Sequence, residues 1–145
     1  MLTTVEKVLF LKSIDLFARI PGEDLAQISV ITEEVTFEDG EAIFEEGELG
    51  DALFLVVSGK VKVHKGSREV ARLGAGECFG EMAILDSAPR SASVSAIDDV
   101  DCLKIAREDF YDILGEKPEI AQGIIRVLTA RLRRTLDDVA GSRAS

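Results

Sequence analysis

The sequence predicts a single domain that is mainly β, with helical segments before and after the strands. Between residues 35 and 105, short apolar runs with strand-like alternation are interrupted by turn residues about every 8–12 residues, a pattern typical of an all-β roll or sandwich. On either side of that region, apolar residues recur at helical spacing. A chain of 145 residues is long enough for one domain with a sizeable core, and it shows no internal repeat.

Residues 1–33 are expected to form N-terminal helices. Pro21, Glu23 and Asp24 mark the start of one of them, because proline suits the first turn and acidic residues suit the positive end of the helix dipole. The apolar residues of this region are expected to pack in the core, and no other role is assigned to them. They are Val5, Val8, Leu9, Leu11, Leu16, Phe17, Leu25, Ile28 and Ile31.

Residues 34–106 are expected to carry the strands. Asp39 and Gly40 give a hairpin-type turn signal between two alternating runs, so we expect the strands on either side of them to pair. Residues 52–57 are almost all apolar, which predicts a strand buried on both faces. Further strands are indicated around Val61 and Val63, Val70 and Leu73, residues 94–96 and residues 100–105, with a turn at residues 65–67.

Residues 107–139 are expected to be helical again, with Gly115 and Pro118 dividing a short helix from a longer one. The longer helix carries a broad apolar stripe. Three roles fit this stripe: packing on the strands, a lid over a ligand, or the seam of a homodimer. Its residues are Ile120, Ile124, Val127, Leu128, Leu132 and Leu136.

The composition narrows the possible partners. The formal net charge is −10, and residues 20–59 hold 11 acidic residues and no basic one, which argues against a nucleic-acid surface and is read as a solubility feature rather than an acidic docking face. No apolar run is long enough to span a membrane, and the first residues do not resemble a signal peptide. Cys78 and Cys102 lie far apart, which indicates a reduced, cytoplasmic setting rather than a disulfide framework.

Catalytic chemistry is not expected. The chain has one histidine, His64, so zinc sites, cupin-type metal sites and Ser-His-Asp triads lack their residues. His64 alternates out of phase with Val61 and Val63 and is expected at the surface. Phosphate-loop and nucleophile-elbow motifs are absent, and no acidic residue sits in a catalytic motif. We therefore expect no enzyme, no metal and no cofactor.

The most informative stretch is residues 79–94. Gly80 sits at a turn, an apolar segment long enough for about one to two helical turns follows, and residues 87–89 break it. Arg90 then opens a strand-like run. Free amides at a helix N-terminus and an arginine fork both favour an anion, and a glycine lets the backbone approach a ligand closely. Glu81 would repel that anion, so we expect it to face a hydroxyl group of a ligand that carries both a phosphate and a ribose.

Residues 79–94 resemble the phosphate-binding cassette of the cyclic nucleotide-binding domain family, from Phe79-Gly80-Glu81 through Pro89-Arg90 to Val94, without a gap between Glu81 and Arg90. The resemblance covers roughly residues 15–136. Outside the cassette it rests on Phe44, Gly47, Gly50, Asp51, Phe54 and Gly59, at the spacing that the family pattern expects.

This resemblance implies an eight-stranded antiparallel β-roll of the jelly-roll type (a double-stranded β-helix) over residues 34–106. N-terminal helices would precede the roll in residues 1–33, and a C-terminal helical lid would follow it in residues 107–139.

It also implies roles for individual residues. Glu81, with the Gly80 backbone beside it, would accept a hydrogen bond from the ribose 2′-hydroxyl, and Arg90 would pair with the phosphate oxygens. The amides of Ala83 and Ser91 would complete the phosphate cradle. The full set of expected ligand-binding residues is Gly80, Glu81, Met82, Ala83, Pro89, Arg90, Ser91 and Ala92, with Val63 and Leu73 as an apolar wall.

The resulting hypothesis is a regulatory domain of bacterial type that binds cAMP, or less favourably cGMP, and couples binding to movement of its last helix. Leu128, Arg131 and Leu132 are candidates to cover the base. The alternative is a module that keeps the fold but binds no nucleotide and serves interaction or dimerisation. Resembling bacterial transcription factors carry a helix-turn-helix after the long helix, and residues 1–145 show none. Two interpretations fit: a stand-alone sensor or, the one we favour, a regulatory domain of a longer protein with an unknown effector. We expect no nucleic-acid or membrane partner for this chain itself.

Overall fold

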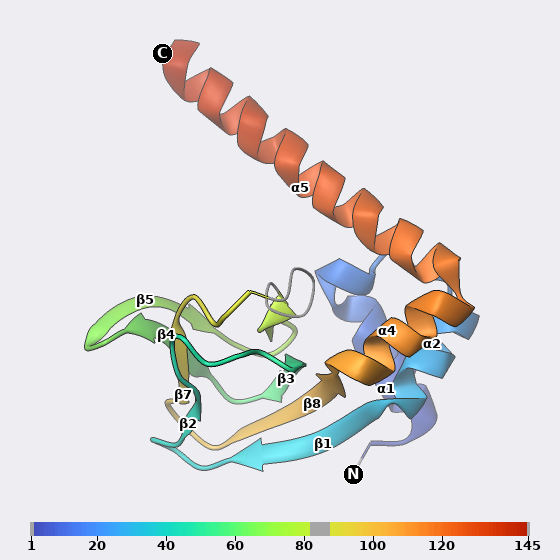
Figure 1. Ribbon diagram of the computed structural model, residues 1–145, viewed down its shortest axis with the longest axis horizontal. Coiled ribbons are helices and arrows are strands. Elements are labelled where there is room, and N and C mark those ends of the chain that lie inside the picture. The colour runs from blue at the N-terminus through green and yellow to red at the C-terminus, as the bar shows by residue number, and fades with distance from the viewer. Residues whose placement is uncertain (1, 82–87, 145) are drawn as a thin grey trace.

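The computed structural model describes residues 2–81 and 88–144. Helices flank a body of short antiparallel strands (Figure 1), which confirms the predicted fold class. The helices are α1 (Thr4–Ser13), η1 (Asp15–Phe17), α2 (Gly22–Val30), α4 (Arg107–Glu116) and α5 (Pro118–Ala144). The strands are β1 (Thr32–Phe37), β2 (Ala42–Phe44), β3 (Ala52–Ser58), β4 (Val61–Lys65), β5 (Arg68–Leu73), β6 (Cys78–Phe79), β7 (Ser93–Ala96) and β8 (Val100–Ala106).

The strands form two four-stranded sheets, in the orders β1-β8-β3-β6 and β2-β7-β4-β5, and all their pairings are antiparallel. The expected strand buried on both faces is β3. Its Leu53 and Leu55 join one core with the helices, while Phe54 and Val56 join a second core inside the roll. This period-two alternation lets a single strand serve two cores.

The expected hairpin at Asp39 and Gly40 is wrong. β1 pairs with β8, and β2 pairs with β7 in the other sheet. The amide of Gly40 donates to the carbonyl of Ala96 (2.9 Å), so this turn carries the chain from one sheet to the other. Alternation in a sequence predicts which face a strand buries, but it does not name the partner strand.

His64 is half-buried rather than at the surface. The register between β4 and β5 shifts between Val63 and His64, which changes the local alternation. One ring nitrogen, Nδ1, lies 2.8 Å from the carbonyl oxygen of Gly66, and Nε2 lies 2.9 Å from the hydroxyl of Ser95. The ring is therefore held by ordinary hydrogen bonds within the sheet.

The apolar stripe of helix α5 is buried in its first part and exposed in its second. Ile120 and Ile124 are buried in the core that joins the helices to the outer face of β3 and β8, and Val127 is also buried, whereas Leu132 and Leu136 are each 60% exposed. Beyond the docked part the helix projects from the body (Figure 1) and runs to Ala144, past the expected end at residue 139. Within the described residues, no helix has both the length and the apolar character needed to cross a bilayer.

Candidate ligand-binding site

A cavity of about 280 Å³ lies where β6 and the segment 88–94 meet β2, β4 and the end of β5. Ligand cavities usually start at roughly this size, near 300 Å³. The predicted site residues that line it are Val63, Leu73, Gly80, Glu81, Pro89, Arg90, Ser91 and Ala92. Met82 and Ala83, which belong to the same prediction, lie outside the described residues, as does the expected short helix of the cassette.

The cavity also has lining residues that the sequence did not identify as ligand contacts: Phe44, Cys78, Phe79, Ala88 and Val94. Phe79, Ala88 and Val94 belong to the cassette stretch, residues 79–94, and this position in the motif could have identified them as cavity residues. Phe44 is far away in the sequence. It reaches the cavity because β2 pairs with β7, with Phe44 opposite Val94, and no local pattern announces that pairing.

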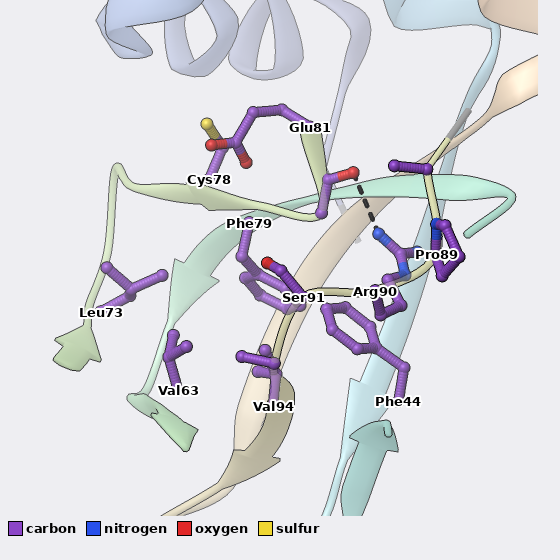
Figure 2. Close-up of a pocket in the computed structure, with 13 residues that line it drawn as sticks. Phe44, Val63, Leu73, Cys78, Phe79, Glu81, Pro89, Arg90, Ser91 and Val94 are labelled. Carbon is purple, nitrogen blue, oxygen red and sulfur yellow. Dashed lines mark hydrogen bonds between the residues drawn. The ribbon is translucent and has the colours of Figure 1, made fainter. Parts of the chain in front are cut away.

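The cavity has an apolar end and a cationic end (Figure 2). Val63, Leu73 and Val94 gather on one side, and Arg90 lies beside Phe44 on the other. The apolar side is built by sheet register, since Val63 of β4 lies opposite Val94 of β7. This division suits a ligand that carries an anionic group and a flat apolar group.

Arg90 is the central polar residue of the site, and it is only 6% exposed. Its Nη2 donates to the carbonyl of Ala52 (2.8 Å), and its Nη1 donates to the carbonyl of Gly80 (3.0 Å), the bond drawn in Figure 2. Its guanidinium carbon lies 4.0 Å from the ring centroid of Phe44. The backbone is also fixed, because the amide of Arg90 donates to the carbonyl of Glu48 (2.7 Å).

The charge of Arg90 is only weakly compensated. Among the described residues, no carboxylate forms an ion pair with its guanidinium. Burial lowers the pKa of Arg90, and the negative charges of Asp51, Glu48 and Glu81 oppose that effect from a distance. An arginine nevertheless stays protonated at neutral pH. A buried cation bonded to neutral carbonyls and a ring retains a strong attraction for an anion.

Gly80 permits this arrangement in two ways. Its φ is +86°, a conformation that other residues rarely adopt. A Cβ atom built at this position would lie 2.6 Å from Nη1 of Arg90 and 3.0 Å from the carbonyl oxygen of Ala52. Any larger residue would therefore displace the guanidinium.

Glu81 points away from Arg90. Figure 2 shows its side chain directed to the Cys78 side of the cavity, where its charge acts on the thiol. Burial, reinforced by the charge of Glu81, raises the pKa of Cys78 to about 12, so this thiol is neutral and a poor nucleophile. Glu81 and Arg90 thus act on different parts of the cavity, in line with the hypothesis that they contact different groups of one ligand.

No described residue of α5 lines the cavity. Arg131, one of the candidates to cover a base, is instead paired with Asp15 of η1, with 2.8 Å between Nη2 and Oδ2. In this structure α5 therefore packs on the N-terminal helices and does not contribute to the cavity wall as a lid.

Comparison with known proteins agrees with this geometry. The family model described as "Cyclic nucleotide-binding domain" matches residues 34–117. The cyclic AMP receptor protein of Thermus thermophilus is 43% identical over 102 residues, covering 67% of this chain and 47% of its own length.

Solved structures point the same way. The N-terminal domain of a transcriptional regulator from Streptomyces coelicolor has a TM-score of 0.81 and 34% identity, covering 88% of this chain and 95% of that one. The regulatory domain of Toxoplasma gondii PKA, solved with cAMP, has a TM-score of 0.72 and 30% identity, covering 76% of this chain and 44% of that one.

The chain spans about half the length of the curated relatives it matches. The matched family model nevertheless covers more than half of this chain, and it includes the whole roll from β2 to β8 and the segment that carries Arg90. The chain belongs to the cyclic nucleotide-binding domain family.

Proposed function

We propose that the cavity binds a cyclic nucleotide, with cAMP preferred over cGMP. The observation that carries this proposal is the buried guanidinium of Arg90, which lines the cavity and has no carboxylate partner among the described residues. The cyclic phosphate would supply the missing negative charge through charge-assisted hydrogen bonds.

The rest of the ligand follows from the two ends of the cavity. The base would pack on Val63, Leu73 and Val94, and the ribose would lie between the base and the phosphate. Glu81 would then accept a hydrogen bond from the 2′-hydroxyl, which requires its side chain to rotate away from Cys78. That rotation changes only side-chain torsions, so it is a small cost against the bond gained.

The preference for cAMP is supported by the relatives. The protein from T. thermophilus is named a cyclic AMP receptor, and the similar regulatory domain from T. gondii was solved with cAMP. In the resembling family, a hydroxyl residue directly after the arginine can reach the 2-amino group of guanine. Ser91 supplies a hydroxyl there, but members that prefer cAMP can also carry serine at this position, so Ser91 decides little between the two nucleotides.

We further propose that binding shifts the position of α5. The helix is docked only through its first part and leaves Leu132, Leu136 and Val139 exposed. A ligand moves such an equilibrium by its difference in affinity for the two helix positions. The exposed residues would then meet a second copy of the chain or an effector.

Calorimetric titration of the purified chain with cAMP, cGMP and linear 5′-AMP tests the binding proposal. We expect saturable one-site binding, tightest for cAMP. Because a retained ligand would hide binding, a denatured and extracted sample is analysed for nucleotide in parallel. An empty extract together with no heat for either cyclic nucleotide would contradict the proposal.

That outcome would favour the second candidate, a module that keeps the fold for interaction or dimerisation. The exposed apolar residues of α5 are the observation that favours it, since a surface of this kind in a soluble chain usually meets a partner. Sedimentation of the chain with and without Leu132→Glu would then detect self-association and its loss.

A further inference from the structure

The guanidinium of Arg90 is held on its edge and on its face. The carbonyls of Gly80 and Ala52 accept hydrogen bonds at the edge. The ring of Phe44 covers a face at 4.0 Å, well inside the roughly 6 Å range of cation–π attraction. Figure 2 shows the guanidinium between the Gly80 carbonyl and this ring.

The ring of Phe44 is itself fixed in position. Its centroid lies 5.8 Å from that of Phe79 and 6.3 Å from that of Phe54, distances typical of packed aromatic pairs. Phe54 and Phe79 stack on each other at 5.1 Å. The platform below Arg90 is therefore a cluster of rings anchored in both sheets, rather than one mobile side chain.

This platform matters because Arg90 is buried and lacks a carboxylate partner among the described residues. A carboxylate would neutralise the guanidinium and compete with an anionic ligand. A ring attracts the cation through its quadrupole and leaves the charge available. An aromatic neighbour thus holds the arginine without occupying its anion-binding capacity.

We infer that Phe44 is a positioning residue for the proposed phosphate contact, holding the Arg90 guanidinium through its ring face so that the cavity is preorganised for the anion. This inference rests on the proposed function. It assigns to β2, far from the cassette in sequence, a direct influence on affinity.

The test measures cAMP affinity by calorimetry for Phe44→Leu, Phe44→Tyr and Phe37→Leu. Phe37 is the matched control, since its ring also packs on Phe54 (6.1 Å) but has no cation–π contact with Arg90. We expect Phe44→Leu to weaken binding about tenfold, and Phe44→Tyr and Phe37→Leu to change it by less than about threefold. Equal losses in Phe44→Leu and Phe37→Leu, or none in Phe44→Leu, would overturn the inference.

The same substitution made in a chain that lacks Arg90 shows whether Phe44 acts through Arg90 or only through its own packing in the cavity wall. In an Arg90→Gln chain the cation is gone, so adding Phe44→Leu should cost less than about threefold in affinity, measured with cAMP at millimolar concentration. The same tenfold cost in both backgrounds would show that Phe44 acts independently of Arg90. If Phe44→Leu does not unfold cooperatively, fluorinated phenylalanines at position 44 replace it. They keep the shape and weaken the ring quadrupole, so affinity should fall stepwise with fluorination, and constant affinity would refute the role.

One measurement needs no ligand. The Nε–H proton of Arg90 should show a ring-current shift in the NMR spectrum of the free protein, and Phe44→Leu should remove it. If the wild-type chain binds no cyclic nucleotide, the proposed function fails whatever the spectrum shows. If it binds and Phe44→Leu binds equally well, only the role of Phe44 fails.

Discussion

Two arginines connect distant parts of this chain, and they do so in opposite surroundings. Arg90 is buried and bonds to the carbonyl of Ala52, with no carboxylate partner among the described residues. Arg131 on α5 is 37% exposed and pairs with the carboxylate of Asp15, which is 64% exposed. An exposed ion pair is screened by water and contributes little to stability. A buried cation that has no anionic partner still attracts an anion strongly. The surroundings of Arg90 are therefore suited to binding an anionic ligand, and the pair of Arg131 with Asp15 is suited to a weak contact between α5 and η1 that can be broken and remade.

The largest effect is expected from Arg90→Ala. The substitution removes the charge-assisted contact to phosphate, so cAMP binding should weaken by about 1.5–3 kcal/mol or more, which is tenfold to more than a hundredfold. Calorimetric titration measures the change, with thermal unfolding to establish that the variant is folded. Arg72→Ala, at an exposed arginine that pairs with Glu69 and does not line the cavity, is the control and should leave affinity within about threefold. Unchanged affinity in Arg90→Ala would remove the site assignment.

Gly80→Ala is expected to act on the same region without removing the charge. The new Cβ would meet Nη1 of Arg90 at 2.6 Å, and the backbone would keep a strained φ of +86°. We expect a loss of about 1–3 kcal/mol in the free energy of unfolding, together with weaker cAMP binding. Chemical denaturation and calorimetry provide the two values. A variant as stable and as tight as the wild type would mean that Arg90 can move freely, against the rigid geometry described above.

Gly123→Ala makes the equivalent change where α5 docks. Its Cβ would lie 3.1 Å from the carbonyl oxygen of Arg19 and 3.2 Å from Cγ1 of Ile20. Alanine favours a helix by about 1 kcal/mol over glycine. Whether the substitution raises or lowers the free energy of unfolding therefore depends on whether residues 19–20 can shift away from the new Cβ atom. We expect the contact to dominate, leaving Gly123→Ala about 1–2 kcal/mol less stable than Gly141→Ala, whose Cβ meets nothing within 4 Å. Equal stability of the two variants in urea denaturation would show that α5 is loosely docked.

The smallest effect is expected from Asp15→Asn. Because both partners are substantially exposed, the pair with Arg131 should contribute about 0.2–1 kcal/mol, and less at 1 M salt. Thermal unfolding at low and high salt measures it. In an Arg131→Gln background the same substitution should cost nothing, since the partner is already absent. A cost above about 2 kcal/mol that persisted at high salt would be typical of a buried ion pair. The contrast between the exposed Arg131 and the buried Arg90 would then not hold.

Much of this molecule could be predicted from local patterns. A nearly continuous apolar run predicted β3 as a strand with two buried faces, and the spacing from Glu81 to Arg90 named residues that the fold brings to one cavity. These signals are local because side-chain direction along a strand, and the turn at Gly80, depend on a few neighbouring residues.

Other features were decided by contacts between distant residues. The pairing of β2 with β7 overturned the expected hairpin at Asp39 and Gly40, and it brought Phe44 under Arg90. Strand partners are chosen by how two sheets enclose one core, which alternation within a single strand does not encode.

The sequence by itself therefore determined the class of fold, most of the helices and strands, and the charged residues of the cavity, because each rests on short-range periodicity or on a contiguous motif. The two-residue strand β6 and the short helix η1 were not expected. Only the tertiary structure decided that Arg90 is buried on a ring from β2, that Glu81 turns toward Cys78, and that α5 packs on η1 instead of lining the cavity. Each of these depends on which distant surfaces meet, and burial and charge compensation are set by those surfaces.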